Sequence, residues 1–582
     1  MISVSGKKWL FPQYDEREVL TIQQRYGLSD TMARILSARH VILEEIPTFL
    51  DPKIKDLLPD PSLLLGMDAA IDRTIRAIRN KPQPEKITIF GDYDVDGATS
   101  VSLLHKYFEQ IGVQVDYYIP DRLSEGYGVN PDAIRKIHAR ETTLIIMVDC
   151  GTTSVSEVAL ANSLGMDSII LDHHNASVEL PEAVAVVNPH RVDQPFVPYT
   201  QNLCAAGVVF LFLVGLQRSL KNSDFFTFSS LNPQKVPDLM SFCNLVALGT
   251  VCDVMPLQGL NRAFVRRGLD MMRKNHGIRA LIDVAGIKDK ISAGHLGFAV
   301  GPRINAAGRI GSSSLGVQLL TTHDELVAKE IAINLNALNE ERQRMEKRIL
   351  EDAIAQIENN KLADNSVILV GDKSWHAGLI GIVASRLKDR YNRPCFVASF
   401  EEGGACKGSA RSIDGVNIGE LIHKAVKASI LSSGGGHAMA GGFSLSEETF
   451  ADFYGFLNKE TAEFMKEYQP TLKIDAEMSC PSMDLLHELE KFEPFGVGNP
   501  SPKLCFHRVQ PVFVKVLNGG HMQCVFKNEA GSTINAVAFR CESTELGRAL
   551  QCYRRMSIVG TLKEDAIKQG EVRVIMEDVA YT

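Results

Sequence analysis

Residues 87–97 of the chain read Ile-Thr-Ile-Phe-Gly-Asp-Tyr-Asp-Val-Asp-Gly, and the fold can be worked out from this stretch. Its first half is apolar and rich in β-branched residues, as in a strand that is buried on both faces. Its second half carries three carboxylates, Asp92, Asp94 and Asp96, just before a helical pattern over residues 98–110. Such a strand–acid–helix sequence is typical of an open α/β sheet, in which ligands bind beyond the carboxyl ends of the strands.

Further apolar runs follow, with amphipathic helical segments between them, at residues 113–115, 144–148, 168–171 and 184–187. This alternation predicts a parallel, doubly wound sheet with helices on both faces. Polar clusters come after three apolar stretches: Asp149 after 144–148, Asp172-His173-His174 after 168–171, and Asp253 shortly after 245–251. We expect these clusters and the acidic stretch to lie at one edge of the sheet.

A metal site is the hypothesis that unites these clusters, although each has a simpler interpretation. An isolated Asp-x-Asp-x-Asp segment is as often a set of capping and turn-forming aspartates, and a His-His pair alone is more often surface polarity. An EF-hand is disfavoured because the loop follows a strand and lacks the final bidentate Glu. Four clusters in one α/β unit favour a bound cation. Carboxylate and imidazole ligands without thiolate suit Mn²⁺ or Mg²⁺ better than zinc.

The 582 residues are too many for one hydrophobic core, so we expect several domains. Residues 323–360 form a long charged helical pattern without Gly or Pro, typical of a connection between domains. A second, smaller α/β unit follows, and short alternating strands with glycine turns then predict a C-terminal β-barrel. The expected divisions are an N-terminal segment 1–50, the parallel-sheet domain 51–322, the connecting helix 323–360, the second α/β domain 361–465 and the barrel 466–582.

Composition excludes some classes of protein. The net charge of −8 neither indicates nor excludes nucleic-acid binding, because local Lys and Arg provide phosphate affinity. Eleven scattered cysteines without a Cys-x-x-Cys pair argue against a zinc ribbon or a disulfide framework and for a reducing cytoplasm. The apolar run 203–216 is too short to span a bilayer, and the N-terminus lacks the features of a secretory signal. We therefore expect a cytoplasmic protein without a membrane partner.

The four polar clusters together resemble the motifs of the DHH phosphoesterase family. Stretches at residues 301–309, 375–382, 408–412 and 434–442 occur in the order seen in the family's bacterial single-strand-specific 5′→3′ exonucleases. The resemblance covers nearly the whole chain, including the C-terminal barrel, which it identifies as similar to an OB-fold. It implies an enzyme of DNA repair and recombination that hydrolyses single-stranded DNA from a 5′ end and releases 5′-mononucleotides.

The resemblance also implies two divalent metal ions, Mn²⁺ or Mg²⁺, that share a nucleophilic water and clamp the scissile phosphate. The implied metal ligands are Asp92, Asp94, Asp96, Asp149, His173 and Asp253. Asp149 would bridge the ions, and Asp92 would be either a ligand or a partner of one. The catalytic group comprises Asp149, His173, His174 and Asp253, with His174 on a non-bridging phosphate oxygen. Phe90 departs from the family pattern, which often has a ligating histidine there.

Substrate residues are also implied by the resemblance. Ser409 and Arg411, with Arg122, would hold the 5′-terminal phosphate, although the residues alone favour ordinary glycine turns with a capping Ser and a surface Arg. Residues expected to contact the DNA backbone nearer the metals are Arg303, Asn305 and Arg309, and His437 would face the active site. By resemblance, single-strand-binding protein and a helicase are partners.

Two alternatives remain: a DHH phosphodiesterase of short oligonucleotides or cyclic dinucleotides, and a non-catalytic scaffold.

Overall fold

The computed structural model describes residues 1–80, 83–121, 125–126, 128–223, 225–226, 236–401, 403–565, 568 and 570–582. The chain forms two compact units. Unit 1 contains Met1–Asn336 and Thr471–Thr582, and unit 2 contains Ala337–Pro470. No helix among the described residues is both long and apolar enough to cross a membrane.

The first half of unit 1 is built on a five-stranded parallel sheet with the order β3-β2-β4-β5-β6. The strands are β2 (Ile87–Gly91), β3 (Asp116–Tyr118), β4 (Leu144–Val148), β5 (Asp167–Leu171) and β6 (Ala185–Val187). Every residue of β2 and β4 is buried, as their continuous apolar sequences predict. The doubly wound parallel sheet is therefore confirmed.

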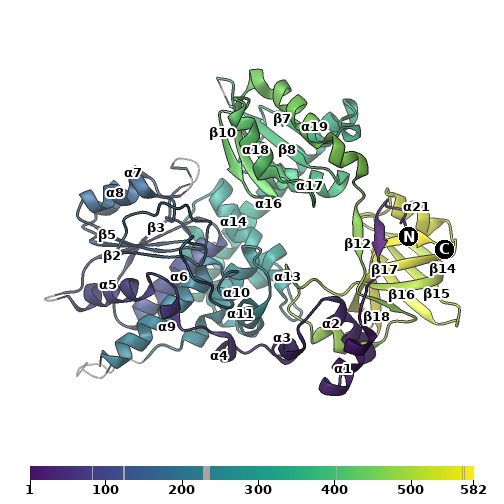
Figure 1. The fold of residues 1–582 in the computed structure, drawn as a ribbon, viewed down its shortest axis with the longest axis horizontal. Helices are drawn as coiled ribbons and strands as arrows, with labels where there is room; N and C mark the ends of the chain where they lie inside the picture. The colour runs from purple at the N-terminus through teal and green to yellow at the C-terminus, as the bar shows by residue number, and fades with distance from the viewer. Residues whose placement is uncertain are drawn as a thin grey trace. The chain divides into compact units, whose positions relative to one another are not determined.

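Helices cover both faces of this sheet (Figure 1). One face packs against α7 (Pro131–His138) and α8 (Val155–Ser163), whose apolar side chains join Phe90, Met147 and Ile170 in one core. The other face packs against α5 (Met67–Arg79), α6 (Val95–Gln110) and α9 (Ala205–Asn222). Both faces are therefore closed to water, and the polar clusters can emerge only at the ends of the strands.

The expected strand at 113–115 is wrong by a few residues. Val113 is buried against the end of α6, and the extended residues that pair with β2 are those of β3. The apolar side chain at Val113 belongs to the turn that ends the helix, where the backbone N–H of Val113 donates to the carbonyl of Phe108. A short apolar run is thus a poor guide to register when a helix end also needs an apolar contact.

A helical layer completes this half of unit 1 and carries Asp253 and the stretch 301–309. Its main helices after α9 are α10 (Cys243–Cys252), α11 (Gly259–Leu269), α12 (His276–Val284), α14 (Gly301–Ile310) and α15 (Leu315–Thr321). A short π-helical segment, η5 (Leu296–Val300), leads into α14. The long helix α16 (Glu325–Asn359) then runs from unit 1 into unit 2.

Unit 2 has a mixed five-stranded sheet with the order β10-β11-β9-β8-β7. The strands are β7 (Ile368–Asp372), β8 (Cys395–Phe400), β9 (Ala405–Arg411), β10 (Ser433–Gly436) and β11 (Ala440–Ser446). The helices α17 (Ile380–Tyr391), α18 (Ile418–Lys427) and α19 (Phe450–Glu467) pack on it. The stretches 408–411 and 434–436 therefore lie in paired strands, so the glycine-turn interpretation of these residues is wrong.

The C-terminal part of unit 1 is a barrel in which β14 (Leu504–Leu517) pairs with both β15 (His521–Lys527) and β17 (Met556–Glu564). The strands β16 (Thr533–Ala538) and β18 (Val572–Tyr581) complete it. The N-terminal helices α1 (Glu16–Tyr26) and α2 (Asp30–Ala38) share its hydrophobic core. The predicted C-terminal barrel is confirmed.

Candidate active site

The acidic stretch after β2 is a tight turn that caps two helices. Asp94 is the N-cap of α6, and its carboxylate accepts hydrogen bonds from the backbone N–H groups of Asp96 and Gly97. The Asp96 carboxylate accepts from the backbone N–H groups of Ala205 and Ala206 at 2.6 and 3.1 Å. These amides form the N-terminus of α9, whose positive end stabilises a carboxylate. Gly97 is required because a side chain would collide with the backbone of Asp92.

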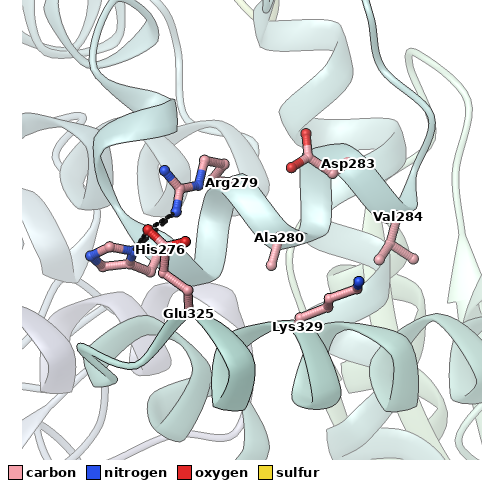
Figure 2. Close-up of a pocket in the computed structure, with 7 residues that line it drawn as sticks. All are labelled: His276, Arg279, Ala280, Asp283, Val284, Glu325 and Lys329. Carbon is pink, nitrogen blue, oxygen red and sulfur yellow. Dashed lines mark hydrogen bonds and ion pairs between the residues drawn. The ribbon is translucent and has the colours of Figure 1, made fainter.

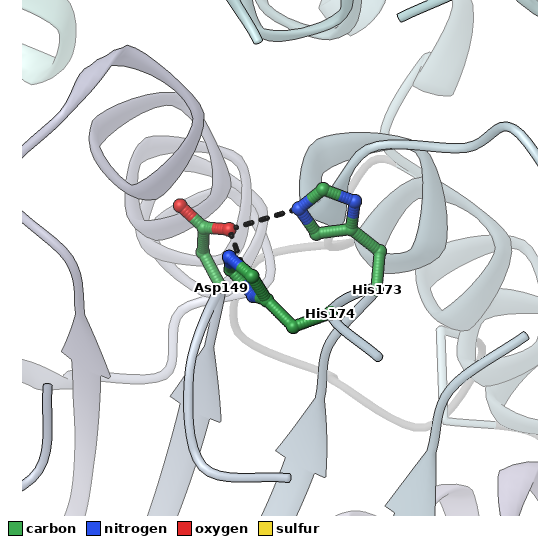
Figure 3. A group of neighbouring side chains, drawn as sticks. All are labelled: Asp149, His173 and His174. Atoms are coloured by element: carbon green, nitrogen blue, oxygen red, sulfur yellow. Dashed lines mark ion pairs between the residues drawn. The ribbon is translucent and has the colours of Figure 1, made fainter. Parts of the chain in front are cut away.

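The predicted clusters come together at the carboxyl ends of β2, β4 and β5. His173 Nε2 lies 3.3 Å from Asp149 Oδ1, 3.5 Å from Asp253 Oδ2 and 3.8 Å from Asp96 Oδ2. Figure 3 shows Asp149 between the two imidazoles, with His174 Nδ1 at 4.0 Å from the same carboxylate oxygen. Asp149 has a positive φ of 59°, a backbone conformation that Asp tolerates and that is found at functional sites.

Three overlapping groups of side chains could each hold a cation. Their potential ligand atoms lie within 4.8 Å of one another in Asp92–Asp94–Asp149, in Asp96–His173–Asp253 and in Asp149–His173–His174. Asp149 and His173 each belong to two groups. All six predicted metal ligands are therefore collected in one place, with Asp149 positioned where a bridging ligand is expected. Phe90 points into the hydrophobic core and stacks on Tyr118, so it contributes nothing to this cluster.

The electrostatics of the cluster favour a bound cation. Burial and repulsion from the neighbouring carboxylates raise the pKa of Asp149, and the same causes raise the pKa of Asp96 to about 7 and of Asp253 to about 9. Burial lowers the pKa of His173 to about 4, so its imidazole is neutral and able to ligate. His173 Nε2 and Asp253 Oδ2 are buried and have no hydrogen-bond partner in the part of the chain that the structure describes. A hard divalent cation would satisfy these atoms, and the donor set fits Mn²⁺ or Mg²⁺.

Asp172 and His174 form a separate ion pair beside the cluster. His174 Nδ1 lies 2.8 Å from Asp172 Oδ1, and the same oxygen accepts from the backbone N–H of His173. Burial disfavours the charge on both side chains, but their hydrogen bond lowers the pKa of Asp172 and raises that of His174 to about 9. His174 is therefore cationic at neutral pH, whereas its neighbour His173 is neutral.

Asn188 connects the loops that carry these residues, and the sequence patterns gave it no role. It directly follows β6 and is fully buried. Its amide nitrogen donates to the carbonyl of His174 at 2.8 Å and to Thr152 Oγ1 at 2.9 Å, and its oxygen accepts from the backbone N–H of His190. Thr152 N donates in turn to Asp172 Oδ2. One amide thereby fixes the loops after β4, β5 and β6 to one another.

Two of the α14 residues that were predicted to contact DNA make hydrogen bonds within the protein. Asn305 Oδ1 accepts from the backbone N–H of Val95 at 3.1 Å, so this side chain braces the acidic turn. Arg303 donates to Asn336 Oδ1 and to the carbonyl of Ala299. Arg309 lies half-buried near the end of the same helix. The helix is held against the acidic turn, because a side chain at Gly308 would collide with Tyr93.

The predicted phosphate residues of unit 2 lie side by side on β9. Arg411 Nη1 donates to Ser409 Oγ at 3.1 Å and to the carbonyl of Ala410. Burial lowers the pKa of Arg411, and no carboxylate of the described residues pairs with it. Gly381, in the first turn of α17, faces both side chains: a Cβ there would lie 2.9 Å from Ser409 Oγ. A half-buried guanidinium, a hydroxyl and a helix N-terminus without a carboxylate suit an anion.

The other predicted substrate residues are less informative. His437 is exposed between β10 and β11, where its backbone N–H donates to the carbonyl of Ala440. Arg122 lies outside the described residues. Two aromatic side chains of the barrel, Phe513 and Phe539, are 46% and 58% exposed, so neither belongs to the barrel core.

A cavity of about 380 Å³ lies away from the acidic cluster, between α12 and the start of α16 (Figure 2). Its charged groups already neutralise one another: Glu325 Oε1 lies 2.5 Å from Arg279 Nη2 and 3.3 Å from His276 Nδ1. It contains none of the predicted site residues. The acidic cluster remains the better candidate for chemistry.

Comparisons with known proteins agree with this placement. The DHH family, N-terminal domain, matches residues 86–250, the DHHA1 domain residues 364–463 and the RecJ OB domain residues 474–578. The chain is 34% identical to the single-stranded-DNA-specific exonuclease RecJ of Bacillus subtilis, over 96% of this chain and 69% of that protein.

Solved structures are similar over nearly the full length. RecJ from Thermus thermophilus in complex with Mn²⁺ has a TM-score of 0.79 and 26% identity, and the match covers 99% of this chain and 79% of that one. The Mg²⁺ complex of the same protein has a TM-score of 0.73 and 25% identity, with the same coverage.

Proposed function

The chain belongs to the RecJ family of single-stranded-DNA-specific exonucleases, and from that premise we propose that it releases 5′-mononucleotides successively from the 5′ end of single-stranded DNA. It is a metal-dependent exonuclease. The observation that carries the proposal is the cluster of five buried or half-buried carboxylates with His173, in which bound cations would relieve the repulsion between the carboxylates.

The residues divide into two groups, and Asp149 of the first lies 3.3 Å from His173 of the second. Asp92 and Asp94 with Asp149 would hold one ion, and Asp96, His173 and Asp253 would hold the other. When bound, such ions supply an activated water and a Lewis acid for the scissile phosphate. His174, kept cationic by Asp172, would donate to a non-bridging phosphate oxygen as negative charge grows there. Asp172 and Asn188 would hold the histidine loop in place during turnover.

The 5′ polarity would come from unit 2. A terminal phosphate monoester carries more negative charge than a backbone diester, and it presents more free oxygens to a guanidinium and a hydroxyl. Arg411, Ser409 and the N-terminus of α17 form such an anion site, with Arg122 as a further proposed contact. Arg303 and Arg309 are proposed to contact the DNA backbone, and His437 to face the reacting end.

The parts expected from the sequence are proposed to divide this work. Residues 51–322 would hold the metals, and residues 361–465 would bind the 5′ end. The barrel, residues 466–582, would bind the trailing strand, because OB-folds bind single strands through basic grooves and stacking aromatics. We further propose a cytoplasmic location, with single-strand-binding protein and an unwinding helicase as partners, on the strength of the sequence motifs.

The test uses a 60-nucleotide single strand with one end blocked, supplied with Mn²⁺ or with EDTA. Blocking the 5′ end should stop digestion, blocking the 3′ end should not, and EDTA should abolish activity. Digestion stopped by the 3′ block alone would refute the polarity. A preference for five-nucleotide substrates would instead favour a phosphodiesterase of short oligonucleotides.

A further inference from the structure

Phe298 is an aromatic side chain that the fold leaves in water. It is 89% exposed, and no large apolar side chain among the described residues is more exposed. It lies on the π-helical segment η5, a type of helix that is rare and frequent at functional sites. Its neighbours Leu296 and Val300 are fully buried, so the segment itself is firmly packed and only Phe298 projects from it.

The segment is packed against the end of α10 that carries Asp253. Cys252 Sγ donates to the carbonyl of Leu296, and a side chain at Gly301 would collide with the same sulfur atom. Gly297, directly before Phe298, faces Val251. The aromatic ring is therefore anchored beside the last turn of the helix that presents a proposed metal ligand.

A second exposed apolar side chain follows that ligand. Val254 is 63% exposed and has a φ of 61°. A positive φ is a true outlier for a β-branched residue, and such strain persists where the surrounding structure imposes it. The chain thus holds Val254 in water, next to Asp253, at a cost in conformational energy. Single exposed apolar residues are common. Here one of them directly follows a proposed metal ligand, and the other lies on a segment that packs against the end of the same helix.

We propose that Phe298, with Val254, forms an apolar ledge on which unpaired nucleobases of the substrate stack beside the metal cluster. This proposal rests on the proposed function and identifies the residues that would contact the nucleobases. The cluster and Arg411 recognise only phosphates, which duplex and single strands share. Exposed base faces distinguish a single strand from a duplex, and an aromatic ring binds every base without sequence preference. Val254 directly follows Asp253, and the segment that carries Phe298 packs against the same end of α10, so the bases that the ledge would bind are those next to the scissile phosphate.

The test compares two 5′-phosphorylated single strands, one natural and one in which the first five nucleotides lack bases. For the unchanged protein we expect kcat/KM to be on the order of 10-fold higher on the natural strand. Phe298→Ala should reduce kcat/KM on the natural strand to the level of the base-free strand and leave the base-free strand unaffected. Phe298→Trp should retain the preference, and Val254→Ala should weaken it less than Phe298→Ala.

Phe196→Ala is the matched control, because Phe196 is 77% exposed and lies on the loop after β6, outside the ledge. It should leave both rates unchanged. Equal losses on both strands with Phe298→Ala, or no loss on either, would overturn the ledge. So would a Phe298→Ala change that alters the oligomeric state, because the ring would then contact a second copy of the chain. Failure of the proposed function is distinguishable, since the unchanged protein would then degrade neither strand.

Discussion

The acidic cluster of unit 1 and the Ser409–Arg411 site of unit 2 carry unpaired charges of opposite sign. In the first, buried carboxylates crowd together and burial with mutual repulsion raises the pKa values of Asp96, Asp149 and Asp253. In the second, the half-buried guanidinium of Arg411 has a hydroxyl and a carbonyl for partners, and partial burial lowers its pKa. One site is short of positive charge and the other of negative charge.

The difference indicates what each site binds. Buried charges are normally paired, so an unpaired set of one sign points to a ligand of the other sign. Cations complete the first site, and a phosphate completes the second. A phosphodiester substrate with a 5′-phosphate and its metal ions would supply both. Replacing a charged residue of either site by a neutral one should therefore stabilise the ligand-free protein. The same replacement should abolish the function of that site.

The largest effect is expected for Asp149→Asn. The amide keeps the shape of the side chain but removes the charge shared by two of the proposed metal groups, so kcat should fall on the order of 10³-fold or more. In EDTA the variant should have a higher Tm than the unchanged protein, because one repelling carboxylate is gone. Mn²⁺ should raise the Tm of the unchanged protein much more than that of the variant.

The exposed Asp132 on α7 offers a matched control, because Asp132→Asn removes the same charge from the same unit. It should leave kcat and the Mn²⁺-dependent rise in Tm unchanged. Activity that survives Asp149→Asn would contradict the metal mechanism as a whole.

A smaller and more selective effect is expected for Arg411→Met. Loss of a charge-assisted hydrogen bond to phosphate should reduce kcat/KM on 5′-phosphorylated strands by about 10- to 100-fold. Strands with a 5′-hydroxyl should be affected little, so the preference for the phosphate disappears. Arg390→Met, which changes an exposed arginine of the same unit, should alter neither rate. Equal losses on both kinds of strand would mean that Arg411 supports the fold and does not bind the 5′ end.

Asn188→Ala should weaken the metal site without removing a ligand. Partners that orient metal ligands typically contribute about 10- to 100-fold in metal affinity or activity. We expect the Mn²⁺ concentration for half-maximal activity to rise by about 10-fold while KM for DNA at saturating Mn²⁺ stays unchanged. Asn188→Asp keeps the acceptor for the His190 N–H but loses the donors to His174 and Thr152, so it should resemble Asn188→Ala. A change confined to KM would contradict this positioning role.

These sites also differ in how far the sequence predicts them. The acidic cluster was predictable because continuous apolar runs mark buried parallel strands, and the residues after such strands must share one edge of the sheet. Asp149 and His173 were placed by that rule alone. Asp253 follows a helix, α10, so the rule does not cover it, and its place in the cluster was implied by the resemblance to the DHH family.

The remainder needed the three-dimensional structure. Ser409 and Arg411 lie in β9 directly after Gly408, and a glycine inside a strand weakens the strand pattern, so the local sequence favours a turn. Asn188 precedes a proline and looks like a turn residue, and its contacts with Thr152 and His174 are long-range. The packing of α1 and α2 into the barrel core joins the two ends of the chain, which no local pattern can indicate.

The smallest expected effect is a pH dependence of the metal-free protein. A carboxyl group whose pKa is raised by folding contributes stability below its unfolded pKa and loses it as the pH rises through the folded value. For Asp96 and Asp253 that loss extends to about pH 7 and about pH 9, and His174, raised to about 9, loses stability over the same upper range. His173, lowered to about 4, opposes this trend only below its unfolded pKa of about 6.5. In EDTA the Tm should therefore fall by about a few degrees between pH 7 and pH 9. Asp253→Asn should reduce this fall. Saturating Mn²⁺ should reduce it to the contribution of His174, because bound cations keep the carboxylates ionised at both pH values. An equal slope with and without Mn²⁺ would show that these groups are not the ones that the metals neutralise.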